Sequence, residues 1–124
     1  MPNNAEDQAK QNVDIRFAPE FKHNLRQLAK KYRRIRSDIQ PLIEQLLHYE
    51  TPGDRIPGLD AVVYKVRLHN TDSRKGARGG YRAIYYMQTK DSIILLTIYS
   101  KTEQGDASAA FIRQVILESP NDAL

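Results

Sequence analysis

Two runs of β-branched and aromatic residues, Tyr81–Met87 and Ile93–Tyr99, dominate the second half of this 124-residue chain. Only residues 88–92 separate them, which is the length of a hairpin turn. Strands joined by so short a turn pair antiparallel, because a parallel pair needs a crossover of about a dozen residues or more. Any fold of this chain must therefore contain an antiparallel sheet.

The rest of the chain supplies further strands and helices. Residues 13–17 and 61–68 alternate apolar and polar side chains, the period of a half-buried strand. Apolar residues at helical spacing predict two helices over 19–32 and 37–47, joined by a short link, and a short third helix over 108–117. The predicted class is α+β: one small antiparallel sheet of about four strands, with the N-terminal helical hairpin and the short C-terminal helix packed on one face.

The boundaries of the fold follow from composition. Residues 1–12 are polar and predict a disordered tail, so we expect one domain over 13–118 followed by a short tail over 119–124. Pro and Gly at 52–53 and 57–58 predict a loop over 50–60 between the helical and the strand halves.

Several classes of protein are excluded by the same composition. No apolar run approaches the roughly 18 residues of a membrane span, and the polar N-terminus lacks the apolar core of a secretory signal. Cysteine is absent, which excludes disulfides and thiolate metal sites. We therefore expect a cytoplasmic protein that does not associate with membranes.

The formal net charge of +4 is unevenly distributed along the chain. Residues 21–37 carry +7 and residues 62–101 carry +6, so the remainder carries −9. Clustered Lys and Arg favour a polyanionic partner, because they displace counterions from a phosphate backbone. The first segment is consistent with either a solvated helix face or an accessory RNA contact.

The second basic segment is the more informative one. Strand alternation places Lys65 and Arg67 on one face and Tyr64, Val66 and Leu68 on the other. A flexible basic loop over 74–80 then leads to Arg82, and Lys101 ends the last strand. Antiparallel pairing in a suitable register gathers the candidate catalytic residues on one basic face: Lys65, Arg67, Arg82 and Lys101.

Such a face has most of the groups that RNA cleavage requires. Arginine stabilises a phosphorane but stays protonated, whereas a lysine surrounded by positive charge can act as a base. The three histidines, His23, His48 and His69, are scattered and no acidic cluster accompanies them, so we expect neither a metal nor another cofactor. Of these, His69 follows a strand, and a solvated side chain is the simpler interpretation.

Three segments, 63–68, 75–86 and 95–101, resemble the RelE/ParE toxin superfamily and in particular its RelE/HigB-like branch of type II toxin–antitoxin toxins. The most specific is Lys-Gly-Ala-Arg-Gly-Gly-Tyr-Arg-Ala-Ile-Tyr-Tyr, and the resemblance extends over about residues 13–117. It implies a microbial-ribonuclease-like fold and an mRNA interferase that cleaves translated mRNA in the ribosomal A site without metal. Its implied partners are the ribosome, mRNA and a cognate antitoxin with an acidic or partly disordered segment.

The resemblance also implies residue roles. Lys65 is the candidate base or charge stabiliser, Arg67 and Arg82 hold the scissile phosphate, and Lys101 matches the lysine that ends the last strand. The implied RNA-binding residues are Arg74, Lys75, Arg78 and Tyr99, of which Tyr99 is either a general acid or a packing residue.

The chain departs from the family pattern at Thr102, Ser108 and Ala77, which leaves the general acid open. Two alternatives therefore remain. One is a ParE-like inhibitor of DNA gyrase without catalysis of its own, and the other is a catalytically weak relative that only binds RNA or the ribosome.

Overall fold

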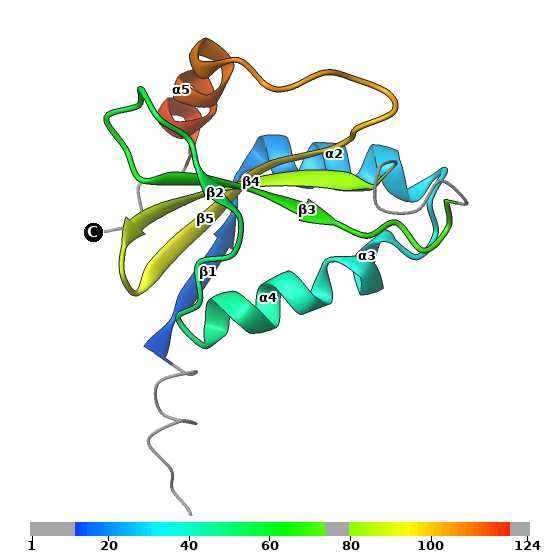
Figure 1. The fold of residues 1–124 in the computed structure, drawn as a ribbon, viewed down its shortest axis with the longest axis horizontal. Helices are drawn as coiled ribbons and strands as arrows, with labels where there is room; N and C mark the ends of the chain where they lie inside the picture. Colours follow the sequence, from blue (N-terminus) through cyan, green and yellow to red (C-terminus); the bar gives the residue numbers. More distant parts are fainter. Residues whose placement is uncertain (1–11, 74–79, 120–124) are drawn as a thin grey trace, which may run out of the picture.

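The computed structural model describes residues 12–73 and 80–119 and confirms the α+β class. Most of the two predicted tails, residues 1–11 and 120–124, lies outside the described residues. The centre of the fold is a mixed five-stranded sheet with strand order β1-β5-β4-β3-β2. Figure 1 shows the sheet between α5 on one side and α4 on the other. The strands are β1 (Asp14–Phe17), β2 (Asp54–Arg55), β3 (Val63–Leu68), β4 (Tyr81–Thr89) and β5 (Ser92–Ser100).

The expectation of a purely antiparallel sheet of about four strands was wrong in two respects. The first strand, β1, pairs in parallel with β5, Asp14 lying opposite Ser92 and Phe17 opposite Leu95. The hairpin argument applies only to strands joined by short turns, and nearly the whole domain separates these two in sequence. The second difference is β2, which lies in the predicted loop and pairs antiparallel with β3 through Asp54 and Arg55.

The N-terminal helical hairpin is present, but its second helix is divided. The helices are α2 (Pro19–Ala29), α3 (Ile35–Asp38), α4 (Gln40–Leu47) and α5 (Ala109–Glu118). Ile39 ends α3 and also precedes the first turn of α4, where Pro41 follows. Proline has no backbone N–H and is accommodated only in a first helical turn, so the helix restarts at this point. None of these helices in residues 12–73 and 80–119 is long and apolar enough to cross a membrane.

The helices cover both faces of the sheet, not one face as the sequence suggested. Two buried clusters, one on each face, show this. The first packs the helical hairpin on the sheet through Phe21, Ile35, Leu42, Leu46, Ala83, Tyr85 and Leu95. The second packs α5 on the opposite face through Val63, Ile84, Ile94, Leu96, Ile112 and Val115. The fold of α5 back over the sheet also draws the connecting segment 101–108 across that face (Figure 1).

Candidate anion-binding site

The predicted alternation of β3 is confirmed by the packing. Tyr64, Val66 and Leu68 belong to the cluster under the helical hairpin. Lys65 and Arg67 therefore project from the other face, the one that α5 partly covers. Towards its C-terminal end, β3 thus carries only positively charged side chains on that face, those of Lys65 and Arg67.

The strand register makes basic residues of two adjacent strands direct neighbours. Arg67 lies opposite Arg82 in the β3–β4 ladder, and Arg82 lies opposite Tyr99 in the β4–β5 ladder. Residues opposite each other in an antiparallel ladder share a face and lie about 4.5–5.5 Å apart at their Cβ atoms. The two arginines are consequently direct neighbours, although fourteen residues separate them in sequence.

These side chains line a hollow of about 230 Å³, which we call the basic hollow. Its walls are Asp54, Lys65, Arg67, Arg82, Lys101 and Asp106. All four candidate catalytic residues lie here, so the structure brings together a set that the sequence could place only by face. Four cations against two carboxylates leave a formal excess of two positive charges, which favours an anionic ligand.

Asp106 occupies part of this hollow. Its Oδ1 atom lies 3.4 Å from Lys65 Nζ and 3.3 Å from Lys101 Nζ. A hydrogen bond from Lys101 and the charge of Lys65 hold the pKa of the Asp106 carboxyl below its ordinary value. Both lysines are thus paired with one carboxylate, in the position where an anionic ligand would also be attracted.

Arg82 differs from the lysines because no carboxylate pairs with it among residues 12–73 and 80–119. The residue is only 8% exposed, and its guanidinium donates a hydrogen bond from Nη1 to the carbonyl oxygen of Tyr81 at 3.3 Å. A buried charge without a counter-charge costs free energy, and a bound anion removes that cost. Arg67, directly opposite, is exposed. The two arginines therefore form the part of the hollow that is ready for an anion.

Tyr99 on β5 does not line the hollow but contacts it through Asp106. It is 4% exposed, packs in the cluster under α5, and donates from its hydroxyl to Asp106 Oδ1 at 3.4 Å. Burial raises the pKa of its hydroxyl, and the backbone N–H of Ala107 acts in the opposite direction. Tyr99 is thus a packed side chain whose protonated hydroxyl reaches the edge of the site.

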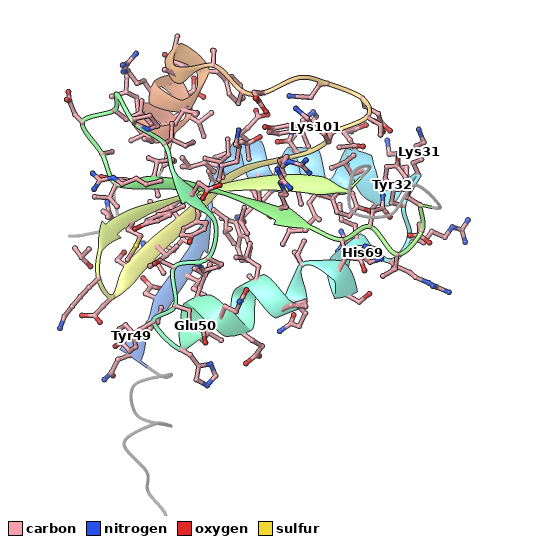
Figure 2. The ribbon with its side chains drawn as sticks, in the orientation of Figure 1. Lys31, Tyr32, Tyr49, Glu50, His69 and Lys101 are labelled. Carbon is pink, nitrogen blue, oxygen red and sulfur yellow. The ribbon has the colours of Figure 1, made fainter. Side chains whose placement is uncertain are left out.

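Contacts at both ends hold segment 101–108 in place over this face. Lys31 Nζ and the Tyr32 hydroxyl each donate to Glu103 Oε2 at 2.8 Å. Figure 2 shows Lys101 on the same side of the molecule as Lys31 and Tyr32, and far from Tyr49 and Glu50. At the other end, Ser108 accepts a hydrogen bond from the backbone N–H of Phe111 at 3.1 Å and so caps α5.

Two of the residues that depart from the pattern of RelE/HigB-like toxins, Ser108 and Thr102, have local structural roles. Ser108 is the α5 cap, and the hydroxyl of Thr102 lies 3.1 Å from that of Ser100. Neither position supplies an obvious acid to the basic hollow.

Some predicted residues lie elsewhere. Arg74, Lys75 and Arg78, with Ala77, fall outside the described residues. His69 is exposed and directly follows β3 (Figure 2). Within the two described ranges, no group of three or more His, Asp or Glu side chains is arranged to hold a metal ion.

The two carboxylates of the hollow were missed by the sequence reasoning. Asp54 stands next to the breakers Pro52 and Gly53, and Asp106 follows Gly105, so both resembled ordinary loop residues. The only available signal was that Asp106 is an acid shortly after the basic end of the last strand.

Comparison of the sequence with models of known protein families gives no match, and neither does comparison with curated proteins.

Proposed function

We propose that this protein is the toxin of a type II toxin–antitoxin module, an mRNA interferase of the RelE/HigB-like kind. The observation that carries the proposal is the pair of neighbouring arginines in the basic hollow. Arg82 is buried without a carboxylate partner among the described residues, and Arg67 lies opposite it at the surface. A phosphodiester entering the hollow receives donors from both.

The proposed reaction is a transesterification within the RNA. The 2′-oxygen attacks the adjacent phosphorus while the bond from phosphorus to the 5′-oxygen breaks, giving a 2′,3′-cyclic phosphate and a 5′-hydroxyl. The 2′-hydroxyl loses its proton to a base, and the departing 5′-oxygen gains one from an acid. Lys65 is the proposed base or charge stabiliser, while Arg67 and Arg82 stabilise the extra negative charge of the phosphorane.

Asp106 gives the site a second property under this proposal. RNA must compete with its carboxylate for Lys65 and Lys101, because one oxygen already contacts both ammonium groups. Binding of RNA therefore includes breaking these ion pairs. Lys65 and Lys101 are therefore released from Asp106 when RNA binds, so their part in the reaction depends on the presence of substrate.

The proposal extends to location and partners. We propose a cytoplasmic protein acting on the ribosome, neutralised by an antitoxin whose acidic or partly disordered segment covers the basic hollow. The seven basic residues of 21–37 are all exposed and provide a second positive surface for rRNA or for that segment.

The test adds purified protein to translating ribosomes and maps the ends of a reporter message. Cuts within the translated frame that carry 2′,3′-cyclic phosphates are expected. Intact message at stoichiometric protein contradicts the proposal. Inhibition of gyrase supercoiling in a parallel assay would instead support the ParE-like alternative.

A further inference from the structure

A second hollow, of about 380 Å³, adjoins the basic hollow on the other side of segment 101–108. We call it the side hollow. Asp106 lines both hollows, so one group of a ligand can occupy the basic hollow while the adjacent group of the same ligand lies in the side hollow. The side hollow is formed between α2, β5 and the start of α5, and its walls include Glu20, Asn24, Thr97, Gln104, Asp106 and Phe111.

The walls of the side hollow differ in chemistry from those of the basic hollow. Among the residues that the structure describes, they contain no lysine or arginine, but they include an aromatic ring, two side-chain amides and two carboxylates. Phe111 is 38% exposed, unusual for a phenylalanine in a domain with a well-filled core. An exposed ring beside amide groups is the combination with which proteins bind unstacked bases of single-stranded RNA.

The hydrogen bonds within the side hollow determine which of its polar groups remain able to bind a ligand. Thr97 is 4% exposed and donates from its hydroxyl to Asn24 Oδ1 at 2.8 Å. The Asn24 NH₂ group has no acceptor among the described residues and is left as a donor. The side chains of Gln104 and Glu20 make no hydrogen bond with another described residue, so an amide and a carboxylate acceptor remain as well.

We propose that the side hollow binds one nucleobase of the RNA strand whose phosphate occupies the basic hollow; this inference rests on the proposed function above. The base stacks on Phe111, while Asn24 donates to a ring nitrogen and Glu20 accepts from an exocyclic amino group. Gln104 supplies the paired donor and acceptor that amides offer to adenine. Adenine and cytosine present an amino group beside a ring-nitrogen acceptor, whereas uracil presents a carbonyl oxygen to the Glu20 carboxylate. The side hollow therefore favours amino-bearing bases over uracil.

The first experiment measures binding without cleavage. Trinucleotides with 2′-O-methyl groups cannot undergo the transesterification, and they differ here only in whether the central base is adenine or uracil. NMR titration of the full-length protein is expected to show tighter binding of the adenine ligand, with shifts at Phe111 and Asn24. Phe111→Ala is expected to weaken that binding by about five-fold or more, given the usual worth of base stacking.

The matched control is Leu117→Ala, which removes an apolar side chain that is 79% exposed on the same helix. It does not line the side hollow and should leave binding unchanged. Equal affinity for the two trinucleotides, or shifts at Arg82 with none at Phe111 and Asn24, overturns the inference.

The second experiment maps cleavage sites across a message library. Wild-type protein should prefer codons with an amino-bearing base at one position, and Phe111→Ala and Gln104→Ala should flatten that preference while cuts persist. Variants that keep the wild-type preference overturn the inference but leave the proposed function intact. Absence of any cut by the wild type contradicts the proposed function, and the binding experiment then still decides whether the side hollow takes a base.

Discussion

The carboxylate of Asp106 lies 3.4 Å from the ammonium group of Lys65, although the two residues are 41 positions apart in the sequence. The same oxygen also contacts Lys101. In the absence of ligand the basic hollow is thus partly neutralised by the protein itself, while Arg67 and Arg82 form no ion pair with a carboxylate among residues 12–73 and 80–119.

The first prediction concerns that neutralising carboxylate. Asp106→Asn removes one negative charge from the basic hollow and frees both lysines, so we expect RNA trinucleotides to bind roughly two- to five-fold more tightly at low salt, with the gain shrinking as salt is added. Titration by NMR or calorimetry measures this. Asp60→Asn is the matched control, because this exposed acid lines a different hollow, beside α5. An equal gain in both variants would show a general charge effect and no specific role for Asp106.

The second prediction is a pH dependence of stability. The hydrogen bond from Lys31, and to a smaller extent the one from Tyr32, lowers the pKa of Glu103 below its ordinary value of 4.5. A carboxyl with a lowered pKa in the folded state stabilises the protein above its unfolded-state pKa, and that stability is lost as the pH falls through the folded-state value. The Tm of Glu103→Gln should therefore lie below that of the wild type at neutral pH, and the gap should close in strong acid. A constant gap across this range would contradict the assignment.

The third prediction concerns the turn that places β2 beside β3. Gly53 has φ +93°, and a Cβ atom there would collide with the carbonyl oxygen of Lys65. Gly53→Ala is expected to cost about 2–3 kcal/mol of unfolding free energy, combining backbone strain with displacement of β2. Denaturant unfolding measures the cost.

Gly58→Ala separates the two contributions. Gly58 has φ +80°, but no atom lies within 4 Å of the place that a Cβ atom would take, so this variant carries the backbone strain alone. Equal losses in the two variants would mean that the close approach of Gly53 to β3 has no energetic effect.

The fourth prediction concerns the cap of α5. Ser108 accepts from the backbone N–H of Phe111, so Ser108→Ala should lower the unfolding free energy by about 1 kcal/mol. Ser108→Asp retains an acceptor at the cap and should recover most of the loss. If Ser108→Asp does not recover the unfolding free energy lost in Ser108→Ala, then Ser108 stabilises the protein through a contact other than the helix cap.

Much of this architecture was predictable because it depends on local periodicity. The alternation of Lys65 and Arg67 with Val66 and Leu68 can be predicted from adjacent residues alone, and the packing confirms it. The positions of the long strands follow equally from their β-branched and aromatic composition.

The remaining features depend on contacts between distant segments. The parallel pairing of β1 with β5 joins Asp14 to Ser92, and no local pattern encodes it. The placement of Asp106 depends on the packing of α5 against the face opposite the helical hairpin, whereas the sequence analysis placed both on one face. Registers and loop paths of this kind arise from the summed burial of the whole core, so the acids of the basic hollow were missed.

The most direct test of the central claim compares Arg82→Gln with Lys90→Gln in the ribosome cleavage assay. Each removes one positive charge, but Lys90 is exposed in the turn between β4 and β5 and is not part of the basic hollow. The Tm of each variant reports whether it is folded, and Arg67→Gln, at an exposed position, provides the same test if Arg82→Gln is not. We predict that Lys90→Gln cleaves like the wild type and that folded Arg82→Gln or Arg67→Gln is slower by about 100-fold or more. Wild-type cleavage rates in both folded hollow variants, or no cleavage by the wild type, would contradict the account.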